Sequence, residues 1–357
     1  MIFTEQWCIE PIRPYLTRRH TPPGMQQFAN VSLAPETIEA AFAAANRPYD
    51  GEPHPRLKAI LQQERPMQHT PEWFARRRSL LTASNIASFL GMNRYCSKRM
   101  FLRRAWDELH NAHAISPSRS MPACAWGSKH EAEAAALYSF VTGNKCWAAD
   151  VGLVVHPEMH FLGASPDRVL CDRPVLIEIK APFKRVIEPE VIPPVYVPQV
   201  QSQMEVCDME ECHFVQFTPA TLCTPGILSV LLVRRDRAWW RKYEPLIETY
   251  EVELKRQADE DQEHPPVRRQ RKRKRVENDD DTTAARPVSA TETTPTTTTT
   301  NQTPPPPSKP AEDSMSSSPG VYNIYVDQRI GVAAGFRDLL KLTETPTDQT
   351  ASTSPEQ

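Results

Sequence analysis

The chain has 357 residues, of which 39% are hydrophobic and 24% are charged, and its formal net charge at pH 7 is −2. Its longest apolar run is too short to cross a bilayer, and its first residues do not resemble a secretory signal peptide, so we expect a soluble intracellular protein. The eight cysteines lack CxxC spacing, which argues against a closed zinc site and favours reduced thiols.

Apolar residues are dense from about residue 73 to residue 250 and sparse beyond residue 255. We therefore expect one globular domain over residues 67–255, large enough to bury a core. Residues 1–66 are punctuated by prolines and are interpreted as an N-terminal extension packed on that domain. Residues 256–357 have the polar, low-complexity composition of a disordered tail.

Helix signals come first along the chain. Apolar periodicity and start and stop residues predict helices at 37–46, 70–78, 82–90, 97–109 and 128–142. Short branched segments predict strands at 151–155, 162–164, 168–171 and 175–181. A helix at 198–208, strands at 213–218 and 227–234, and a final helix at 238–254 follow. This order predicts an α/β fold, in which a mixed sheet is flanked by helices.

Two features stand out in the tail. The first is a cationic cluster made of Arg268, Arg269, Arg271, Lys272, Arg273, Lys274 and Arg275. It matches a nuclear localisation signal, and it also matches a flexible arm that binds phosphates without sequence preference. The second is the return of apolar residues at 321–342, which are too few to fold alone and suggest a docking peptide.

The strand expected at residues 175–181 carries charge in an apolar setting. Side chains alternate between the two faces of a strand, so Glu178 and Lys180 share one face while Ile177 and Ile179 point to the other. A surface ion pair on an edge strand would also produce this pattern. Both interpretations stay open from the strand alone.

Asp167 lies in a Ser-Pro-Asp turn just upstream. A short hairpin from Asp167 back to Glu178 would bring both carboxylates to one end of the sheet. Two carboxylates close together repel each other unless a cation lies between them, and Mg²⁺ prefers oxygen ligands. With Lys180 beside them to orient a metal-bound water, these groups suit phosphodiester hydrolysis.

Pro-Asp followed by Glu-x-Lys is the PD-(D/E)xK nuclease signature, and it lies within a series of five blocks. They are LTAS at 81–84 preceded by Trp73 and Arg77, WGSKHE at 126–131, SPD at 165–167, EIKAPF at 178–183, and PQVQ at 198–201. In this order the blocks resemble the YqaJ and phage lambda-type exonuclease family over about residues 73–254. The resemblance implies a restriction-endonuclease-like core. The segment at 107–122 departs from the family pattern.

The resemblance also implies roles at the catalytic end. Asp167, Glu178, Glu131 and the Ile179 carbonyl would hold two Mg²⁺ ions, which Mn²⁺ can replace, and Lys180 would position the attacking water. Ser128-x-x-Glu131 is in addition a capping-box pattern, which gives Glu131 a purely structural alternative.

Further roles follow for the substrate. Gln199 would lie near the attacked phosphate, or would be an exposed polar residue of its helix. Arg77 and Ser84 would bind a terminal 5′-phosphate, although Ser84 also suits a helix cap. Trp73 would pack in the core or wedge against the end base pair.

Taken together, the sequence predicts a 5′-to-3′ exonuclease that degrades one strand of linear double-stranded DNA for recombination or viral genome processing. The alternatives are an endonuclease of the same superfamily and a catalytically silent DNA-binding scaffold. The resemblance further implies DNA ends as the substrate, a single-strand annealing protein as a partner and a homotrimer. The basic cluster implies the nucleus.

Overall fold

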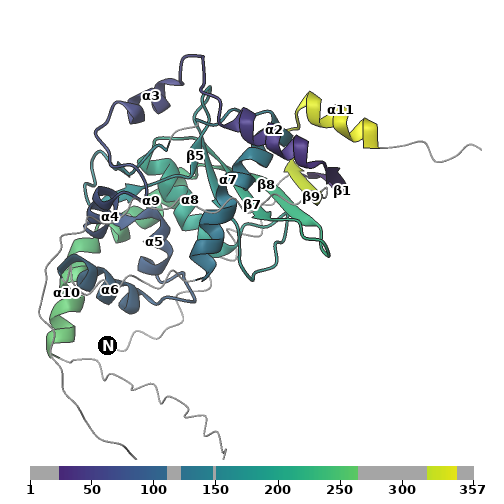
Figure 1. The fold of residues 1–357 in the computed structure, drawn as a ribbon. Coiled ribbons are helices and arrows are strands. Elements are labelled where there is room, and N and C mark those ends of the chain that lie inside the picture. The colour runs from purple at the N-terminus through teal and green to yellow at the C-terminus, as the bar shows by residue number, and fades with distance from the viewer. Residues whose placement is uncertain (1–23, 111–121, 148–149, 264–319, 344–357) are drawn as a thin grey trace, which may run out of the picture.

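The computed structural model describes residues 24–110, 122–147, 150–263 and 320–343. A mixed six-stranded sheet forms the centre of the fold, with strand order β1-β9-β8-β7-β6-β5, and a small sheet of order β2-β4-β3 lies beside it (Figure 1). The strands are β1 (Met25–Leu33), β2 (Leu81–Thr82), β3 (Val154–Val155), β4 (Leu162–Ala164), β5 (Arg168–Val169), β6 (Val175–Lys180), β7 (Glu211–Thr218), β8 (Gly226–Arg234) and β9 (Gly320–Asp327).

Helices flank both sheets. They are α2 (Pro35–Ala45), α3 (Pro55–Leu61), α4 (Pro71–Arg78), α5 (Ala83–Phe89), α6 (Lys98–His110), α7 (Pro122–Thr142), the short 3₁₀ helix η1 (Pro194–Tyr196), α8 (Val197–Val206), α9 (Arg237–Ile247), α10 (Tyr250–Glu263) and α11 (Ala334–Thr343). None of the helices in the described ranges is long and apolar enough to span a membrane. The predicted α/β class, a mixed sheet flanked by helices, is confirmed.

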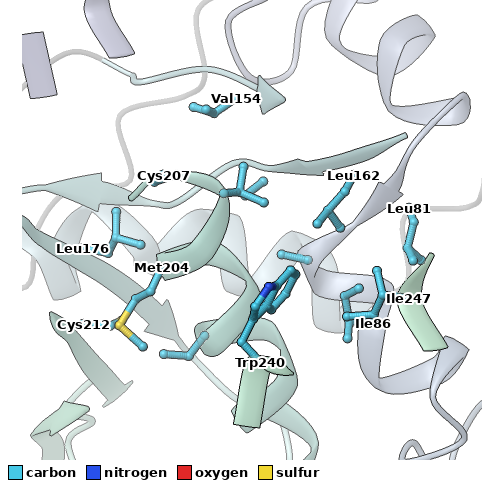
Figure 2. Close-up of a cluster of buried hydrophobic side chains, with 14 of the residues drawn as sticks. Leu81, Ile86, Val154, Leu162, Leu176, Met204, Cys207, Cys212, Trp240 and Ile247 are labelled. Atoms are coloured by element: carbon cyan, nitrogen blue, oxygen red, sulfur yellow. The ribbon is translucent and has the colours of Figure 1, made fainter. Parts of the chain in front are cut away.

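The alternation of side chains along β6 divides the core in two. Ile177 and Ile179 pack on the face that α7 covers, in a cluster that also contains buried residues of β8, β9 and α11. Leu176 packs on the opposite face, with Met204 of α8 and Cys212 of β7 (Figure 2). Glu178 follows Leu176 by two positions and therefore enters the α8 side of the sheet.

Two predicted helices have different limits in the structure. The helix expected from residue 128 begins at Pro122, because proline suits a first helical position and the alanine-rich sequence that follows favours a helix. Ser128 therefore lies well inside α7, and the capping-box alternative for Glu131 is wrong. The helix expected at 238–254 is two helices, α9 and α10, and the Thr249 hydroxyl donates to the Leu246 carbonyl at the break.

The expectation for residues 321–342 is also wrong. They form β9 and α11, and β9 lies inside the main sheet, antiparallel to β1 and parallel to β8. The buried residues Tyr322, Ile324 and Val326 of β9 complete the core below α7. Apolar residues too few to form a domain alone are enough to fill a gap in an existing sheet.

The ends of the folded region differ from the expected boundaries as well. β1 belongs to the same sheet as β6 and α2 packs on α7, so residues 25–45 are part of the fold rather than an extension. α10 continues to Glu263, beyond the expected start of the tail at residue 256. The basic cluster at 268–275 lies outside the described residues.

Candidate active site

The β5–β6 hairpin brings Asp167 and Glu178 together. Its antiparallel register pairs Arg168 with Ile177 and Val169 with Leu176. Continuing that register by one residue places Asp167 opposite Glu178, where side chains of neighbouring strands come close. Asp167 Oδ2 accepts a hydrogen bond of 2.6 Å from the Ile179 N–H. The predicted hairpin geometry is therefore present. Asp167 lies one residue before β5 begins, beside the C-terminal half of β6.

Glu178 is buried, with 1% of its surface exposed. Its Oε1 atom accepts hydrogen bonds from Lys180 Nζ and, at 2.5 Å, from Gln199 Nε2. Its Oε2 atom accepts a bond of 2.7 Å from Gln203 Nε2. Gln199 and Gln203 are four residues apart, so one face of α8 supplies both amides. The alternative that Gln199 is an exposed polar residue is wrong.

Glu131 reaches the same region from α7. Arg168 Nη1 donates to Glu131 Oε1 at 3.1 Å and to the Asp167 carbonyl oxygen at 2.5 Å. One guanidinium thus ties the helix carboxylate to the catalytic hairpin. The predicted site residues Asp167, Glu178, Lys180, Glu131 and Gln199 all converge.

The charges in this cluster influence one another. Burial raises the pKa of Asp167 well above its ordinary value, and the negative charges of Glu178 and Glu131 raise it further. Burial alone would lower the pKa of Lys180, but the charges of Glu178 and Asp167 outweigh burial and raise it. The cluster therefore combines three carboxylates, those of Asp167, Glu178 and Glu131, with two cations, Lys180 and Arg168.

The donor set suits a hard divalent cation, since carboxylates and a backbone carbonyl are the ligands that Mg²⁺ prefers. A cation would also relieve the repulsion that raises the pKa of Asp167. Within the described ranges, however, no three His, Cys, Asp or Glu side chains stand close enough together to hold an ion. The carboxylate of Glu178 is directed to amides and Lys180, and that of Glu131 to Arg168.

A second group lies around α4 and α5. The guanidinium carbon of Arg77 lies 4.3 Å from the centre of the Trp73 ring, and Arg77 Nη2 donates to Ser84 Oγ at 3.4 Å. Burial lowers the pKa of Arg77 and Glu108 opposes that shift. The N-cap of α5 is Thr82, so Ser84 does not cap this helix. Arg77 and Ser84 face each other, as a shared ligand would require.

Trp73 joins this group to the hairpin. It is buried and packs against Leu80 and Leu153, in agreement with the core-packing interpretation. Its Nε1–H donates to Ser165 Oγ at 3.0 Å, two residues before Asp167. Trp73 therefore links the Arg77 group to the turn that carries Asp167.

Three residues of the site escaped sequence reasoning. Gln203 had a signal, because it follows Gln199 by one helical turn. Arg168 directly follows Asp167, but its bond to Glu131 depends on how α7 packs against the hairpin. Tyr196, whose ring centre lies 5.2 Å from Lys180 Nζ, carried no signal in the sequence.

Comparison with known proteins agrees with the family that the motifs suggested. Residues 72–210 match the YqaJ-like viral recombinase domain. An uncharacterized protein of Acanthamoeba polyphaga mimivirus is 29% identical over 177 residues, covering 45% of this chain and 30% of that protein. A protein of African swine fever virus is 28% identical over 172 residues, covering 40% of this chain and 47% of that protein. The match thus spans less than half the length of each of these curated relatives.

Two solved structures are similar as well. The alkaline exonuclease LHK-Exo of Laribacter hongkongensis is 27% identical, with a TM-score of 0.43, and the match covers 54% of this chain and 97% of that chain. A phage-related exonuclease of Haemophilus somnus is 11% identical, with a TM-score of 0.38, and the match covers 51% and 96%.

Proposed function

We propose, on the premise that residues 72–210 are a YqaJ-like viral recombinase domain, that this chain is a deoxyribonuclease. More specifically, we propose a metal-dependent exonuclease that degrades one strand of linear duplex DNA from its 5′ end. The convergence of Asp167, Glu178 and Lys180 on the β5–β6 hairpin carries the proposal. Phosphodiester hydrolysis needs neutralised phosphate charge and an oriented water, and these groups supply both.

Asp167, Glu178, Glu131 and the Ile179 carbonyl would hold two Mg²⁺ ions, or Mn²⁺ in their place. When bound, a divalent cation neutralises phosphate charge and lowers the pKa of a coordinated water. The support for this assignment is the chemistry of the donors and the mutual repulsion of the carboxylates.

Lys180 has a distinct task in this proposal. Because its pKa is raised, the ammonium stays protonated at neutral pH and does not accept a proton. It acts as a hydrogen-bond donor that orients the attacking water and stabilises charge on the phosphate. Gln199 and Gln203 hold the Glu178 carboxylate in one orientation from α8.

Arg77 and Ser84 are proposed to bind the terminal 5′-phosphate. A guanidinium forks onto phosphate oxygens, and a hydroxyl adds one more donor. The observation that supports this role is the approach of Arg77 Nη2 to Ser84 Oγ, with the guanidinium held against Trp73.

The remaining expectations are proposals from the family resemblance and from composition. We propose that the chain assembles as a homotrimer and passes its single-stranded product to an annealing protein. We also propose that residues 268–275 direct the protein to the nucleus, which for a virus is that of the host.

The test uses the purified full chain on three substrates: 5′-phosphorylated linear duplex, 5′-hydroxyl linear duplex and closed circular DNA, each with Mg²⁺ or EDTA. We expect digestion of the phosphorylated linear duplex with Mg²⁺ only. Lys180→Ala is expected to reduce the rate by about 100-fold or more. Lys242→Ala is the matched control, because Lys242 also lies over a tyrosine ring but on α9.

The 5′-phosphate group is tested with the same substrates. Arg77→Ala is expected to abolish the preference for phosphorylated ends, and Arg78→Ala, whose side chain bonds to the Phe74 carbonyl, is expected to retain it. Equal cutting of closed circles and linear ends would contradict the exonuclease assignment. Full activity of Lys180→Ala would contradict the nuclease site itself.

A further inference from the structure

Arg185, in the loop after β6, has an incompletely bonded guanidinium. Its Nη2 atom is buried and has no hydrogen-bond partner within the described residues. The recorded bond of the side chain is from Nη1 to the carbonyl of the adjacent Val186, at 3.3 Å. A buried donor without a partner is costly and uncommon in folded proteins, so it calls for an explanation.

Three other partly buried arginines of this chain have acidic partners. Arg103 bonds to Asp261, Arg235 to Glu205, and Arg329 to Asp327. For Arg185, no carboxylate among the described residues lies within ion-pair distance. A structural role would therefore leave this cation less satisfied than arginines that fix the fold elsewhere in the molecule.

Arg185 and Lys180 lie near the same aromatic ring, that of Tyr196. Its guanidinium carbon lies 6.0 Å from the centre of the Tyr196 ring, and Lys180 Nζ lies 5.2 Å from the same centre. Tyr196 ends η1 and leads directly into α8, which carries Gln199 and Gln203. Two cations thus lie around one aromatic ring at the end of the catalytic strand.

The surrounding loop is open to a substrate. Phe183 and Val186 expose 44% and 79% of their surface, and Lys184 is exposed as well. This segment directly follows β6, which ends at Lys180. The loop therefore adds positive charge close to the end of β6.

We propose that Arg185 binds the backbone phosphate next to the scissile phosphodiester, on the same strand. This inference rests on the proposed nuclease function and adds a second phosphate site to it. A phosphate offers paired oxygens that match the guanidinium fork. In a DNA strand, a scissile phosphodiester also has a neighbouring backbone phosphate.

The first test measures binding of the full chain to a 5′-phosphorylated linear duplex in EDTA, over a range of salt concentrations. Arg185→Ala is expected to weaken binding by about 10-fold, since it removes one charge-assisted contact. It is also expected to reduce the slope of log K against log salt by about 0.9, the value for one phosphate contact.

Lys341→Ala is the matched control. Lys341 is an exposed cation on α11, which packs on β1 and α7, far in strand order from β6. Its removal changes the net charge equally, and exposed charges that lie apart are screened from each other at physiological salt. We expect the DNA affinity and the salt slope of Lys341→Ala to equal those of the wild type.

The second test locates the phosphate. The substrates are duplexes with one neutral methylphosphonate linkage, placed at successive positions along the digested strand. We expect wild type to bind most weakly to the duplex whose methylphosphonate is next to the scissile bond. At that position Arg185→Ala is expected to show no further loss, because protein and DNA changes remove the same contact. Arg185→Lys, which keeps the charge, is expected to retain part of the position effect.

The outcomes separate this inference from the nuclease proposal. If wild type cuts DNA but Arg185→Ala keeps the wild-type salt slope, or if its effect adds to the methylphosphonate effect at every position, Arg185 is not a phosphate ligand. If wild type neither binds nor cuts DNA, the proposed function itself fails.

Discussion

The Glu178 carboxylate shows how single residues make this site workable. A buried charge is tolerated only when it is paired and hydrogen-bonded. Glu178 meets that condition through three donors: Lys180, Gln199 and Gln203. The two amides hold the carboxylate in one orientation, and Lys180 forms an ion pair with it.

Gln203→Leu tests this support. The substitution leaves Glu178 Oε2 buried without a donor, so we expect the free energy of unfolding to fall by about 2 kcal/mol. Urea denaturation of both proteins measures the difference. In a Glu178→Gln background the same substitution is expected to cost less, because no charge remains to be satisfied. Equal losses in both backgrounds would show that Gln203 acts through packing alone.

At the scale of elements, β9 holds the outer part of the sheet together. In the described part of the chain, β1 pairs with β9 and β9 pairs with β8, so β1 reaches the sheet only through β9. The buried face of β9 lies in the same cluster as Ile177 of the catalytic strand. Residues 320–327 are therefore part of the core that supports the site.

Ile324→Ala distinguishes a core strand from a docking peptide. Ile324 is fully buried, and removal of its side chain is expected to lower the free energy of unfolding by about 2–5 kcal/mol. Thermal and urea denaturation measure this loss, with Lys341→Ala as a surface control that should change stability by less than about 1 kcal/mol. Unchanged stability of Ile324→Ala would restore the docking-peptide interpretation.

For the whole molecule, a buried histidine couples folding to pH. His213 of β7 accepts or donates at Nδ1 with the Tyr138 hydroxyl of α7, at 2.6 Å. Burial lowers the pKa of His213 to about 3, and Arg173 lowers it too. The folded protein therefore holds this imidazole neutral, whereas the unfolded chain protonates it below about pH 6.5.

The sign of the pH effect follows from proton uptake. Between about pH 6.5 and pH 3 the unfolded state binds the extra proton, so stability falls as the pH falls. We expect a contribution of about 1.4 kcal/mol per pH unit in that window. His213→Asn removes the titration, and its urea midpoint is expected to fall less between pH 7 and pH 5 than that of the wild type. Parallel pH profiles of the two proteins would assign acid sensitivity to other groups.

Local sequence patterns were sufficient to predict much of the candidate active site. Alternation along residues 175–181 separates Glu178 from the isoleucines, and the Pro-Asp turn places Asp167 opposite it. Both follow from the period of a strand and the geometry of a short hairpin. The position of Gln199 on a helix after β6 was also predictable, because helix periodicity is a local property.

The sequence by itself determined the class of fold, the hairpin that carries Asp167 and Glu178, and the resemblance to the YqaJ and phage lambda-type exonuclease family, because each rests on local patterns taken in chain order. Only the tertiary structure decided that β9 fills the sheet, that Arg168 binds Glu131, and that Gln203 supports Glu178. Those contacts join segments separated by many residues. Their formation depends on which surfaces remain to be buried once the whole chain is packed, and no local pattern records that.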